Sequence, residues 1–520
     1  MPWQKALAER RYTALKARLA LALALLLLLL CACRTAPPPQ APSDTVDPSA
    51  HADGDDNGYC DDCGEYLLIS LDFYAINDLH GVFDDTNTSD GVDELTTYLR
   101  RAASLSSRTL LLSSGDMWQG SSESNLTRGR IITEWMNELD FVSMTLGNHE
   151  FDWGEEAIRE NAALAEFPFL ALNVFARDTG KLADYCTPSV LLELGGVQVG
   201  VIGAVGDCYS SISGDKVEEV YFAVGDALTE LVKAESEKLR AAGADLIVYS
   251  LHGGYARSGS GSISSGELAS YYDVELSEEG YVDVVFEGHT HYDYARRDPH
   301  GVYHVQNGGY NSSVAHVEIL LNYVTNSSRV RKAETVDVSS MQGLADDPLV
   351  DQLLAKYADE LAIGSRVLGV NAERRSGNAL RQTVAELYLS AGLEKWGDEY
   401  DVVLGGGFLS VRNPGYLAAG EVTYSMLQSL FPFDNELVLC SIRGEDLIRR
   451  FLETDNGNYF IACDPALRGS IDPAATYYVV VDTYSSSYAP NRLTEVARYG
   501  ADVYARDLLA AYMQEGGFAD

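Results

Sequence analysis

The chain has 520 residues, of which 77 are acidic and 38 are basic, so its formal net charge is −39 and its isoelectric point is near 4.4. This charge excludes a protein that binds nucleic acid through a basic surface. Charged residues make up 22% of the chain, which excludes a bundle of membrane-spanning helices, and 46% apolar residues exclude wholesale disorder. At about 100–200 residues per domain, we expect two or three domains.

The first 32 residues have the pattern of an export signal. Five basic residues precede an apolar run of 12 Leu and Ala residues, Leu19 to Leu30. This run is too short to span a membrane, which takes about 20 residues. Its end, Leu30-Cys31-Ala32-Cys33, is similar to a bacterial lipobox, so we predict a signal peptide over 1–32 and a lipid on Cys33. Cys31 is the weaker candidate, and cleavage further along without a lipid is the alternative.

Residues 33–65 are rich in Pro, Asp and Gly without apolar periodicity, which predicts an acidic disordered tether. Within it, residues 53–58 imitate the start of a calcium loop, but Gly64 stands where the last acidic ligand belongs. The Cys60-Asp-Asp-Cys63 segment could bind a metal instead. Six cysteines beyond Cys33 fall into sequence pairs that suit disulfides in an oxidising compartment, with connectivity left open: 60/63, 186/208 and 440/463.

From residue 66 to about 340, short apolar strands alternate with amphipathic helices, which is an α/β order. Strands are predicted over 67–76, 109–112, 141–146, 199–204, 246–251 and 282–286, and helices over 93–104, 130–139 and 226–241. A linker helix is predicted over 341–364, because Asp347 and Pro348 open an apolar 3–4 pattern that Gly364 closes. A second α/β segment covers 365–520.

Five polar motifs each follow a predicted strand: 77–81, 115–120, 147–152, 251–254 and 288–291. They hold five of the nine histidines of the chain. Imidazole nitrogens mixed with carboxylate and amide oxygens favour Zn, Mn or Fe over calcium. Seven such side chains exceed one tetrahedral site and suit two ions that share a carboxylate: Asp78, His80, Asp116, Asn148, His252, His289 and His291. Any one motif could be an ordinary turn; their joint occurrence in this order favours a metal centre.

These motifs resemble those of the calcineurin-like metallophosphoesterases. From residue 66 to its end, the chain resembles the bacterial 5′-nucleotidase / UDP-sugar hydrolase / 2′,3′-cyclic phosphodiesterase family. The resemblance implies a four-layer α/β/β/α metallophosphoesterase sandwich over 66–340 and a smaller α/β substrate-binding domain over 365–520, joined by the linker helix. It also implies two divalent ions (Zn, Mn, Fe or Co), one held by Asp78, His80 and His291 and the other by Asn148, His252 and His289, with Asp116 as the bridge and Gln119 contributing to the first site.

Further roles follow from the same resemblance. His149 would stabilise the reacting phosphorus or protonate the leaving group, with Asp152 orienting it. The segment from Pro432 to Asn435 matches the family's Pro-Phe-x-Asn, whose Phe, here Phe433, is one wall of a base-stacking clamp; the alternative is that Phe433 is a core residue. Tyr484 is the candidate for the second wall, although the family's glycine turn is missing after it. Candidate substrate-binding arginines are Arg412, which stands three places later than in the family, and Arg375 with its neighbours Arg374 and Arg381.

The sequence therefore predicts an exported or lipid-anchored dinuclear phosphohydrolase, a 5′-nucleotidase acting on nucleoside 5′-monophosphates. The alternatives are a 2′,3′-cyclic nucleotide phosphodiesterase, a UDP-sugar pyrophosphohydrolase, or a non-catalytic nucleotide-binding surface lipoprotein. We expect a monomer that binds a nucleotide or another phosphate ester, binds no nucleic acid and meets a membrane only through its N-terminal lipid.

Overall fold

The computed structural model describes residues 48–85, 91–254, 273–453, 459–487, 493–500 and 503–519. The predicted signal peptide, the predicted lipid site at Cys33 and the first part of the predicted tether lie outside these residues. The described chain divides into two compact units, a smaller one with residues 48–70 and Leu320–Ser327 and a larger one with Leu71–Ile319 and the residues from Ser328 onward. In the ranges given above, no helix has both the length and the apolar character needed to cross a membrane.

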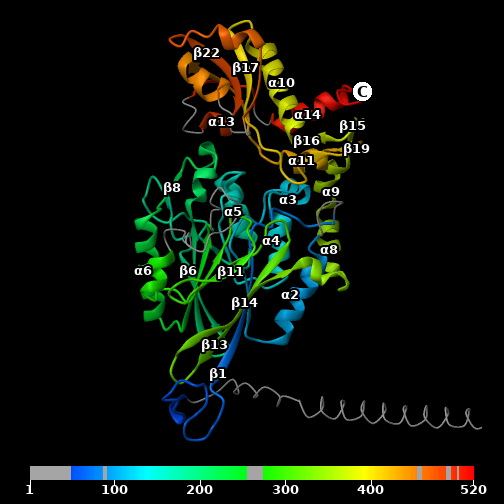
Figure 1. The fold of residues 1–520 in the computed structure, drawn as a ribbon. Helices are drawn as coiled ribbons and strands as arrows, with labels where there is room; N and C mark the ends of the chain where they lie inside the picture. Colours follow the sequence, from blue (N-terminus) through cyan, green and yellow to red (C-terminus); the bar gives the residue numbers. More distant parts are fainter. Residues whose placement is uncertain are drawn as a thin grey trace, which may run out of the picture. The chain divides into compact units, whose positions relative to one another are not determined.

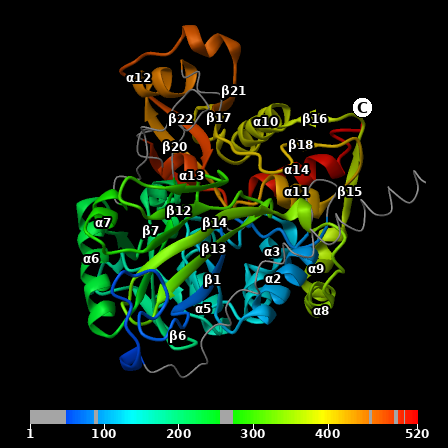
Figure 2. The same cartoon turned by 60° about the horizontal axis from the view of Figure 1, so that its bottom comes forward.

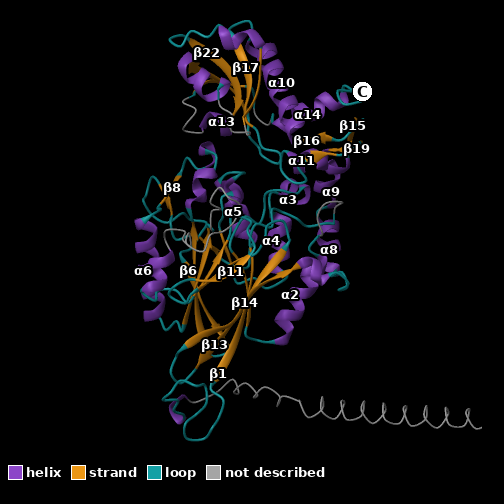
Figure 3. Cartoon of the chain, in the orientation of Figure 1, coloured by secondary structure: helices purple, strands orange, loops and turns teal. Residues whose placement is uncertain are grey.

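Two mixed sheets dominate the first half of the described chain (Figures 1 and 3). The strand order of the first sheet is β14 (Ser328–Asp337), β13 (Ser313–Asn322), β1 (Leu68–Ile76), β2 (Thr109–Ser113), β3 (Ser143–Thr145) and β4 (Phe169–Leu170). The order of the second is β11 (Tyr294–Arg297), β12 (Tyr303–Gln306), β10 (Val284–Glu287), β9 (Leu246–His252), β7 (Val197–Val205) and β6 (Ser189–Leu194). A separate ribbon pairs β5 (Val174–Ala176) with β8 (Val220–Phe222). Figure 2 shows β1, β13 and β14 from a second side.

Helices cover the outer face of each sheet. On the first sheet pack α2 (Asp93–Leu105), α4 (Arg130–Asn137), α5 (Glu155–Leu164) and α8 (Pro348–Lys356). On the second pack α6 (Asp226–Ala241) and α7 (Asp273–Glu278). Figure 3 shows these purple helices outside the orange strands. This is the four-layer α/β/β/α arrangement that the sequence predicts.

Local sequence explains the layers. Strand β1 is buried along most of its length, so its sequence is a nearly continuous apolar run, as expected of a strand covered on both faces. Helix α6 instead has one apolar stripe, with Leu228, Val232 and Leu239 buried, an acidic residue in its first turn and basic residues in its last. Both elements agree with the predicted ranges.

The two sheets meet through small and hydroxylated residues. A Cβ atom added to Gly203 on β7 would lie 2.2 Å from the Cβ of Leu170, so only glycine fits there. Nearby, the Ser250 hydroxyl on β9 lies 2.7 Å from that of Thr145 and 3.0 Å from that of Ser114. These buried contacts hold the ends of β2, β3 and β9 together, and the predicted motifs follow these ends.

The second α/β segment contains a five-stranded sheet and two short strand pairs within its described residues. The sheet order is β21 (Tyr459–Cys463), β17 (Val402–Phe408), β22 (Thr476–Asp482), β20 (Leu437–Arg443) and β23 (Thr494–Arg498). The pairs are β15 (Val367–Asn371) with β19 (Gly420–Thr423) and β16 (Arg375–Ser376) with β18 (Tyr416–Leu417). Its helices are α10 (Gly377–Trp396), α11 (Tyr424–Leu430), α12 (Gly444–Leu447), α13 (Thr483–Ser487) and α14 (Ala505–Gln514). The predicted fold class is thereby confirmed.

The linker predicted as one helix over 341–364 consists of shorter pieces. Helix α8 begins after Asp347, whose side chain accepts a hydrogen bond from the Leu349 N–H at 3.0 Å, and the expected Pro348 stands in its first turn. Tyr357 interrupts the helix, α9 (Ala358–Leu361) follows, and a 3₁₀ turn over Ala362–Ser365 ends the linker. The predicted N-cap at Asp347 is therefore present, but Tyr357, the N-cap position of α9, divides the predicted helix in two.

Two expectations about the N-terminal segment and the cysteines are wrong. Residues 48–65 form hydrogen-bonded turns of the smaller unit and are not a disordered tether, because side-chain contacts order the segment where apolar periodicity is missing. All six cysteines in the described ranges are free thiols. Cys440 and Cys463 lie on β20 and β21, which are three strand positions, about 14 Å, apart, beyond the reach of a disulfide.

Candidate metal centre

The loops that follow β1, β2, β3 and β10 carry six of the seven predicted ligands, and His252, the seventh, is the last residue of β9. Strands β1, β2 and β3 pair in parallel, as do β9 and β10. Their carboxyl ends therefore meet at one edge of each sheet, where α/β folds place chemistry. This topology brings together side chains that are up to about 210 residues apart in sequence.

The first predicted ligand group converges closely. His80 Nε2 lies 3.0 Å from His291 Nε2, and Asp78 Oδ1 lies 3.3 Å from His291 Nε2 and 3.9 Å from His80 Nε2. Two imidazole nitrogens that bind one ion at about 2.0–2.1 Å stand about 3 Å apart, so this separation suits a shared cation.

The second predicted group lies beside the first. Asn148 Oδ1 lies 2.9 Å from His289 Nδ1, and His252 Nε2 lies 3.1 Å from Asp116 Oδ2. Asp116 is also within 4.8 Å of Asp78. The carboxylate of Asp116 thus stands between both groups, the position that a bridging ligand requires.

Hydrogen bonds to main-chain carbonyls fix which ring nitrogen of two histidines faces the centre. His80 Nδ1–H donates to the Gln119 carbonyl at 2.9 Å, and His252 Nδ1–H donates to the Ser114 carbonyl at 2.6 Å. Nε2 of each ring is therefore the nitrogen directed at the carboxylates. Such partners orient histidine ligands at metal sites.

Most of the predicted ligands adopt a backbone conformation that L-residues rarely use. The φ angles are 52° at Asp78 and His80, 55° at Asp116, 75° at His289 and 57° at His291. Asp and His tolerate this left-handed region better than most residues, yet each such position costs on the order of 1–3 kcal/mol. The surrounding structure must supply that energy to hold the side chains in place.

Glu150 supplies part of that support. Its buried carboxylate accepts hydrogen bonds from the main-chain N–H groups of Asp116 at 2.9 Å, Met117 at 2.8 Å and Gly147 at 2.7 Å. Burial and the nearby Asp116 carboxylate raise the pKa of Glu150 to about 7. One side chain therefore ties the loop after β2 to the loop after β3.

The residues present fit divalent cations. In the described part of the chain, the buried Nε2 of His252 and both amide atoms of Gln119 have no hydrogen-bond partner, and a cation would satisfy such atoms. Burial and neighbouring histidines lower the pKa of His80 and that of His289, the latter to about 4, so both rings are neutral ligands. Burial lowers the pKa of His252, but Asp116 outweighs burial and raises it to about 10, so a metal ion must displace a proton there.

His149 lies at the rim of this centre. Its ring Nδ1 is 2.7 Å from Asp152 Oδ2, and its ring Nε2 is 2.6 Å from Arg412 Nη2. Its main-chain N–H donates to Asp116 Oδ1 at 2.8 Å. Burial lowers the pKa of His149, but the carboxylates of Asp152 and Asp116 outweigh burial and raise it. Asp152, the residue predicted to orient His149, thus lies beside Nδ1, and Arg412 reaches the other nitrogen of the same ring.

A cavity of about 440 Å³ opens at His149. Its walls combine polar residues of the metal centre with aromatic and polar residues of the second α/β segment. Those from the sequence predictions are Asp116, Asn148, His149, Asp152, His289, His291, Arg412, Phe433, Asn435 and Tyr484. The ring centroid of Phe433 lies 5.8 Å from that of His149, and the Arg412 guanidinium lies 5.1 Å from the Phe433 ring. Phe433 is therefore a cavity wall, which disfavours the core alternative.

Arg375 is the predicted substrate-binding residue that the structure does not bring to this cavity. Its Nε donates to Asn371 Oδ1 at 3.0 Å, and its guanidinium lies 4.3 Å from the Phe518 ring. Its neighbours Arg374 and Arg381 likewise lie over Tyr416 and Phe460. Sequence position alone placed these arginines near the substrate, but packing on aromatic rings directs them elsewhere.

Several contributors escaped the sequence predictions. Tyr310 stacks on His80 with ring centroids 4.8 Å apart, and its N–H donates to the Asp78 carbonyl at 2.8 Å. Arg506 pairs with Asp434 and donates to the Phe433 carbonyl at 3.1 Å, which fixes the loop that carries Phe433. Tyr310 and Arg506 lie outside the five sequence motifs, so no sequence signal pointed to them. Glu150, described above, does lie inside a motif, between His149 and Phe151.

Comparison with known proteins is consistent with this geometry. Residues 71–293 match the family model for calcineurin-like phosphoesterases. This stretch forms a calcineurin-like phosphoesterase domain. Over 409 residues, the chain is 25% identical to UshA of Yersinia enterocolitica, covering 69% of this chain and 72% of UshA. Two solved structures share the fold over 86% of this chain: a 5′-nucleotidase precursor from Thermus thermophilus (19% identity, TM-score 0.64, 96% of that chain) and a 5′-nucleotidase from Candida albicans (15% identity, TM-score 0.60, 98% of that chain).

The chain is therefore a metal-dependent phosphoester hydrolase, as the sequence predicts. The phosphoesterase domain supplies the His, Asp and Asn side chains of the metal centre. The second α/β segment, which lies beyond residues 71–293, supplies Arg412 and the aromatic residues of the cavity.

Replacing Glu150 by Gln should weaken metal binding by about 10–100-fold, because one acceptor oxygen becomes an N–H₂ group facing main-chain N–H donors. Metal titration of the stripped protein measures this effect. Glu156→Gln, on the exposed side of α5, is the matched control and should bind metal as the wild type does. Unchanged metal affinity in Glu150→Gln would contradict the assigned support role.

Proposed function

We propose that the chain is an exported dinuclear 5′-nucleotidase that hydrolyses nucleoside 5′-monophosphates to nucleosides and phosphate, anchored by a lipid on Cys33. The observation that carries the proposal is one cavity in which the metal-centre residues face Arg412, Phe433 and Tyr484. A phosphate ester at the metal centre would place its leaving group toward these side chains. The nucleotidase-type structures named above share the fold and support this choice.

Two divalent ions fit the two ligand groups. Asp78, His80 and His291 would hold one ion, with Gln119 beside it. Asn148, His252 and His289 would hold the other, and Asp116 would bridge both. When bound, such ions polarise phosphoryl oxygens and lower the pKa of bound water so that it attacks near neutral pH.

His149 is the group that we assign to proton transfer. Asp152, 2.7 Å from Nδ1, holds the ring in the orientation that directs Nε2 at the cavity. Together with Asp116 it favours the protonated ring, so Nε2–H can donate to the leaving oxygen or to a phosphoryl oxygen. The leaving alkoxide takes this proton, and the ring is reprotonated from solvent.

Arg412 would share the phosphoryl group with His149. In the structure its Nη2 lies 2.6 Å from His149 Nε2, close enough for one oxygen to accept from both. A guanidinium is suited to such oxyanion contacts. Inserting the phosphoryl oxygen between the two cationic groups would stabilise both, which gives the site a preference for a charged phosphate.

Aromatic residues of the second segment would bind the base. Phe433 and Tyr484 both line the cavity, and Phe408 packs 5.7 Å from Tyr484. Stacking a base on such rings contributes about 1–3 kcal/mol per base without selecting its identity. Asn435 also lines the cavity, and its amide would select among bases.

Phosphate release should be greatest with AMP or another nucleoside 5′-monophosphate, and chelation should abolish it, because under this proposal the cavity would hold a terminal phosphate at the metal centre and a base against Phe433 and Tyr484. A panel of 5′-AMP, 2′,3′-cyclic AMP, UDP-glucose and ribose 5-phosphate, with and without chelator, measures this. Faster turnover of 2′,3′-cyclic AMP or UDP-glucose than of 5′-AMP would contradict the proposed substrate class and favour the corresponding alternative. Absence of all turnover after reconstitution with Mn, Zn and Co would leave only nucleotide binding.

His149→Ala should lower kcat by about 10²–10⁴-fold while the metal content stays at the wild-type value, because His149 moves a proton and is not a ligand. Steady-state kinetics and elemental analysis measure the two quantities. His300→Ala, at an exposed histidine between β11 and β12, is the control and should match the wild type. Metal loss in His149→Ala would instead show that His149 supports the ions.

Arg412→Ala should raise KM and lower kcat/KM by about 10–100-fold for a nucleoside monophosphate, since a charge-assisted contact contributes about 1.5–3 kcal/mol. Arg375→Ala should stay within about twofold of the wild type, because Arg375 packs on Phe518. Comparing kcat/KM of the two variants tests the placement. The opposite ranking would restore Arg375 to the substrate site.

A further inference from the structure

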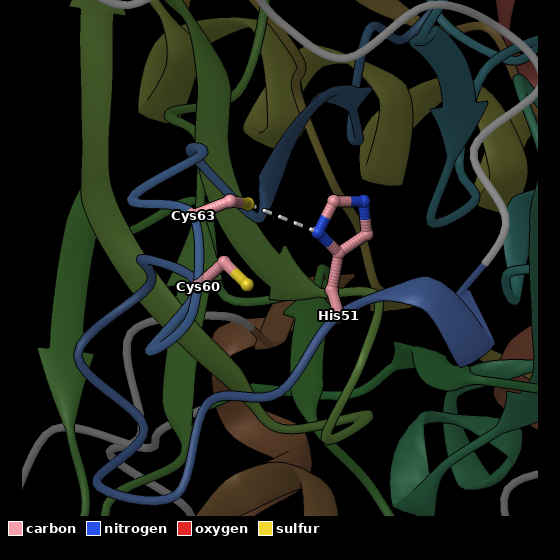
Figure 4. A group of neighbouring side chains, drawn as sticks. All are labelled: His51, Cys60 and Cys63. Atoms are coloured by element: carbon pink, nitrogen blue, oxygen red, sulfur yellow. Dashed lines mark hydrogen bonds between the residues drawn. The ribbon is translucent and has the colours of Figure 1, made fainter.

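The smaller unit gathers two thiols and one imidazole at a site that the phosphohydrolase does not use. His51, Cys60 and Cys63 each offer one ligand atom, and these atoms all lie within 4.8 Å of one another. Figure 4 shows the three side chains turned toward a common point, with a dashed line from Cys63 Sγ to His51 Nδ1. Cys60 is buried, Cys63 is exposed, and His51 is 13% exposed, so the cluster lies just below the surface.

The spacing of these atoms matches a tetrahedral zinc site. Zinc binds sulfur at about 2.3 Å and imidazole nitrogen at about 2.0–2.1 Å, so two such ligands stand about 3.6 Å apart at a tetrahedral angle. In the structure, Cys63 Sγ lies 3.6 Å from His51 Nδ1. This pair already stands at the separation that zinc requires, and Cys60 Sγ lies within 4.8 Å of both atoms.

A tight turn presents both thiols on the same side. The Gly64 N–H donates to the Cys60 carbonyl at 2.8 Å, and Gly64 has a φ angle of 74°, which glycine adopts without strain. The Asp61 N–H donates to the Ala52 carbonyl at 2.7 Å, which brings the neighbouring residue, His51, against this turn.

The second ring nitrogen of His51 also has a partner. His51 Nε2 lies 3.6 Å from Glu65 Oε2, and the imidazole meets the Tyr323 ring edge-on with centroids 6.2 Å apart. This contact is longer than a hydrogen bond, so Glu65 is a charged neighbour of the far nitrogen and does not fix the tautomer. Nδ1 is the ring nitrogen that faces Cys63.

We propose that His51, Cys60 and Cys63 form a structural zinc site, with Nδ1 and the two Sγ atoms as ligands and water in the fourth position. Binding releases the thiol protons to solvent and leaves two thiolates on the ion. Sulfur and nitrogen donors select zinc over the hard cations calcium and magnesium. A structural zinc ion would contribute folding energy to the smaller unit directly.

The neighbouring acidic loop does not compete for this role. The Asp53 carboxylate accepts hydrogen bonds from the N–H groups of Asn57 and Gly58 and from the Asn322 amide at 2.8–3.0 Å. Asp56 Oδ1 accepts from Asn322 at 2.9 Å and Thr325 at 2.8 Å. These carboxylates close the turns of the loop, so the resemblance to a calcium loop has a structural explanation without calcium.

The test is spectroscopic, because the catalytic centre also binds metal. The full-length chain, purified under reducing conditions and stripped of metal, is titrated with Co²⁺ and then Zn²⁺. The proposed site should give a thiolate-to-cobalt charge-transfer band in the near ultraviolet, which nitrogen and oxygen ligands cannot produce, and Zn²⁺ should remove it. Cys63→Ser and His51→Ala should weaken binding by about 100-fold or more, measured by the same band.

Cys208→Ser is the matched control, because Cys208 is the thiol closest to the catalytic histidines, with its Sγ 3.0 Å from the His252 carbonyl. This variant should keep the band. Loss of the band in Cys208→Ser, its absence from the wild type, or a Cys60–Cys63 disulfide found by mass in the protein as isolated would each overturn the proposal. If Cys63→Ser fails to fold, the wild type and Cys208→Ser decide the question alone. Phosphoester hydrolysis is a separate readout, so failure of either proposal leaves the other standing.

Discussion

Two carboxylates buried side by side are the constraint on which the rest of the structure depends. Asp78 and Asp116 are 0% and 1% exposed, and an unpaired charge at such a depth would cost several kcal/mol. Surrounding imidazoles, main-chain N–H donors and divalent ions offset that cost together. The left-handed backbone of the ligand loops and the Glu150 hydrogen bonds exist to hold these charges at one point. Fold and chemistry therefore share a single energetic requirement.

The net charge of −39 makes binding of an anionic substrate a local problem. The overall field repels a phosphate ester at long range, so attraction must come from the cavity itself. Two ions would bring about +4 against the two carboxylates, and Arg412 adds a cation at the rim. Removal of the predicted signal would deepen the contrast, because residues 1–32 hold five basic residues and one acidic residue. The acidic side chains elsewhere on the chain are compatible with solubility, and they are not part of the site.

Sequence predictions succeeded where one local pattern decides the outcome. Strand β1 is a nearly continuous apolar run, and helix α6 shows a single apolar stripe, so their limits were predictable to within a residue or two. Predictions failed where distant packing decides. Arg375 lies in the expected stretch of sequence, but its guanidinium stacks on Phe518, about 140 residues away in the chain. Arg412, offset by three places, nevertheless reaches His149, because the loop after β17 carries it there.

By itself, the sequence determined the α/β class, the strand-end motifs and the identity of the seven metal-ligand candidates, because periodicity and chemically distinctive residues are local properties. The resemblance implied Asp116 as the bridge between the two ligand groups, whereas only the tertiary structure decided that Glu150 ties their loops together. It also brought His51 to the Cys60–Cys63 turn, a partner that sequence spacing did not reveal. Each of these depends on a contact between segments whose spacing has no fixed period, and such contacts are set only when the sheets and turns have packed.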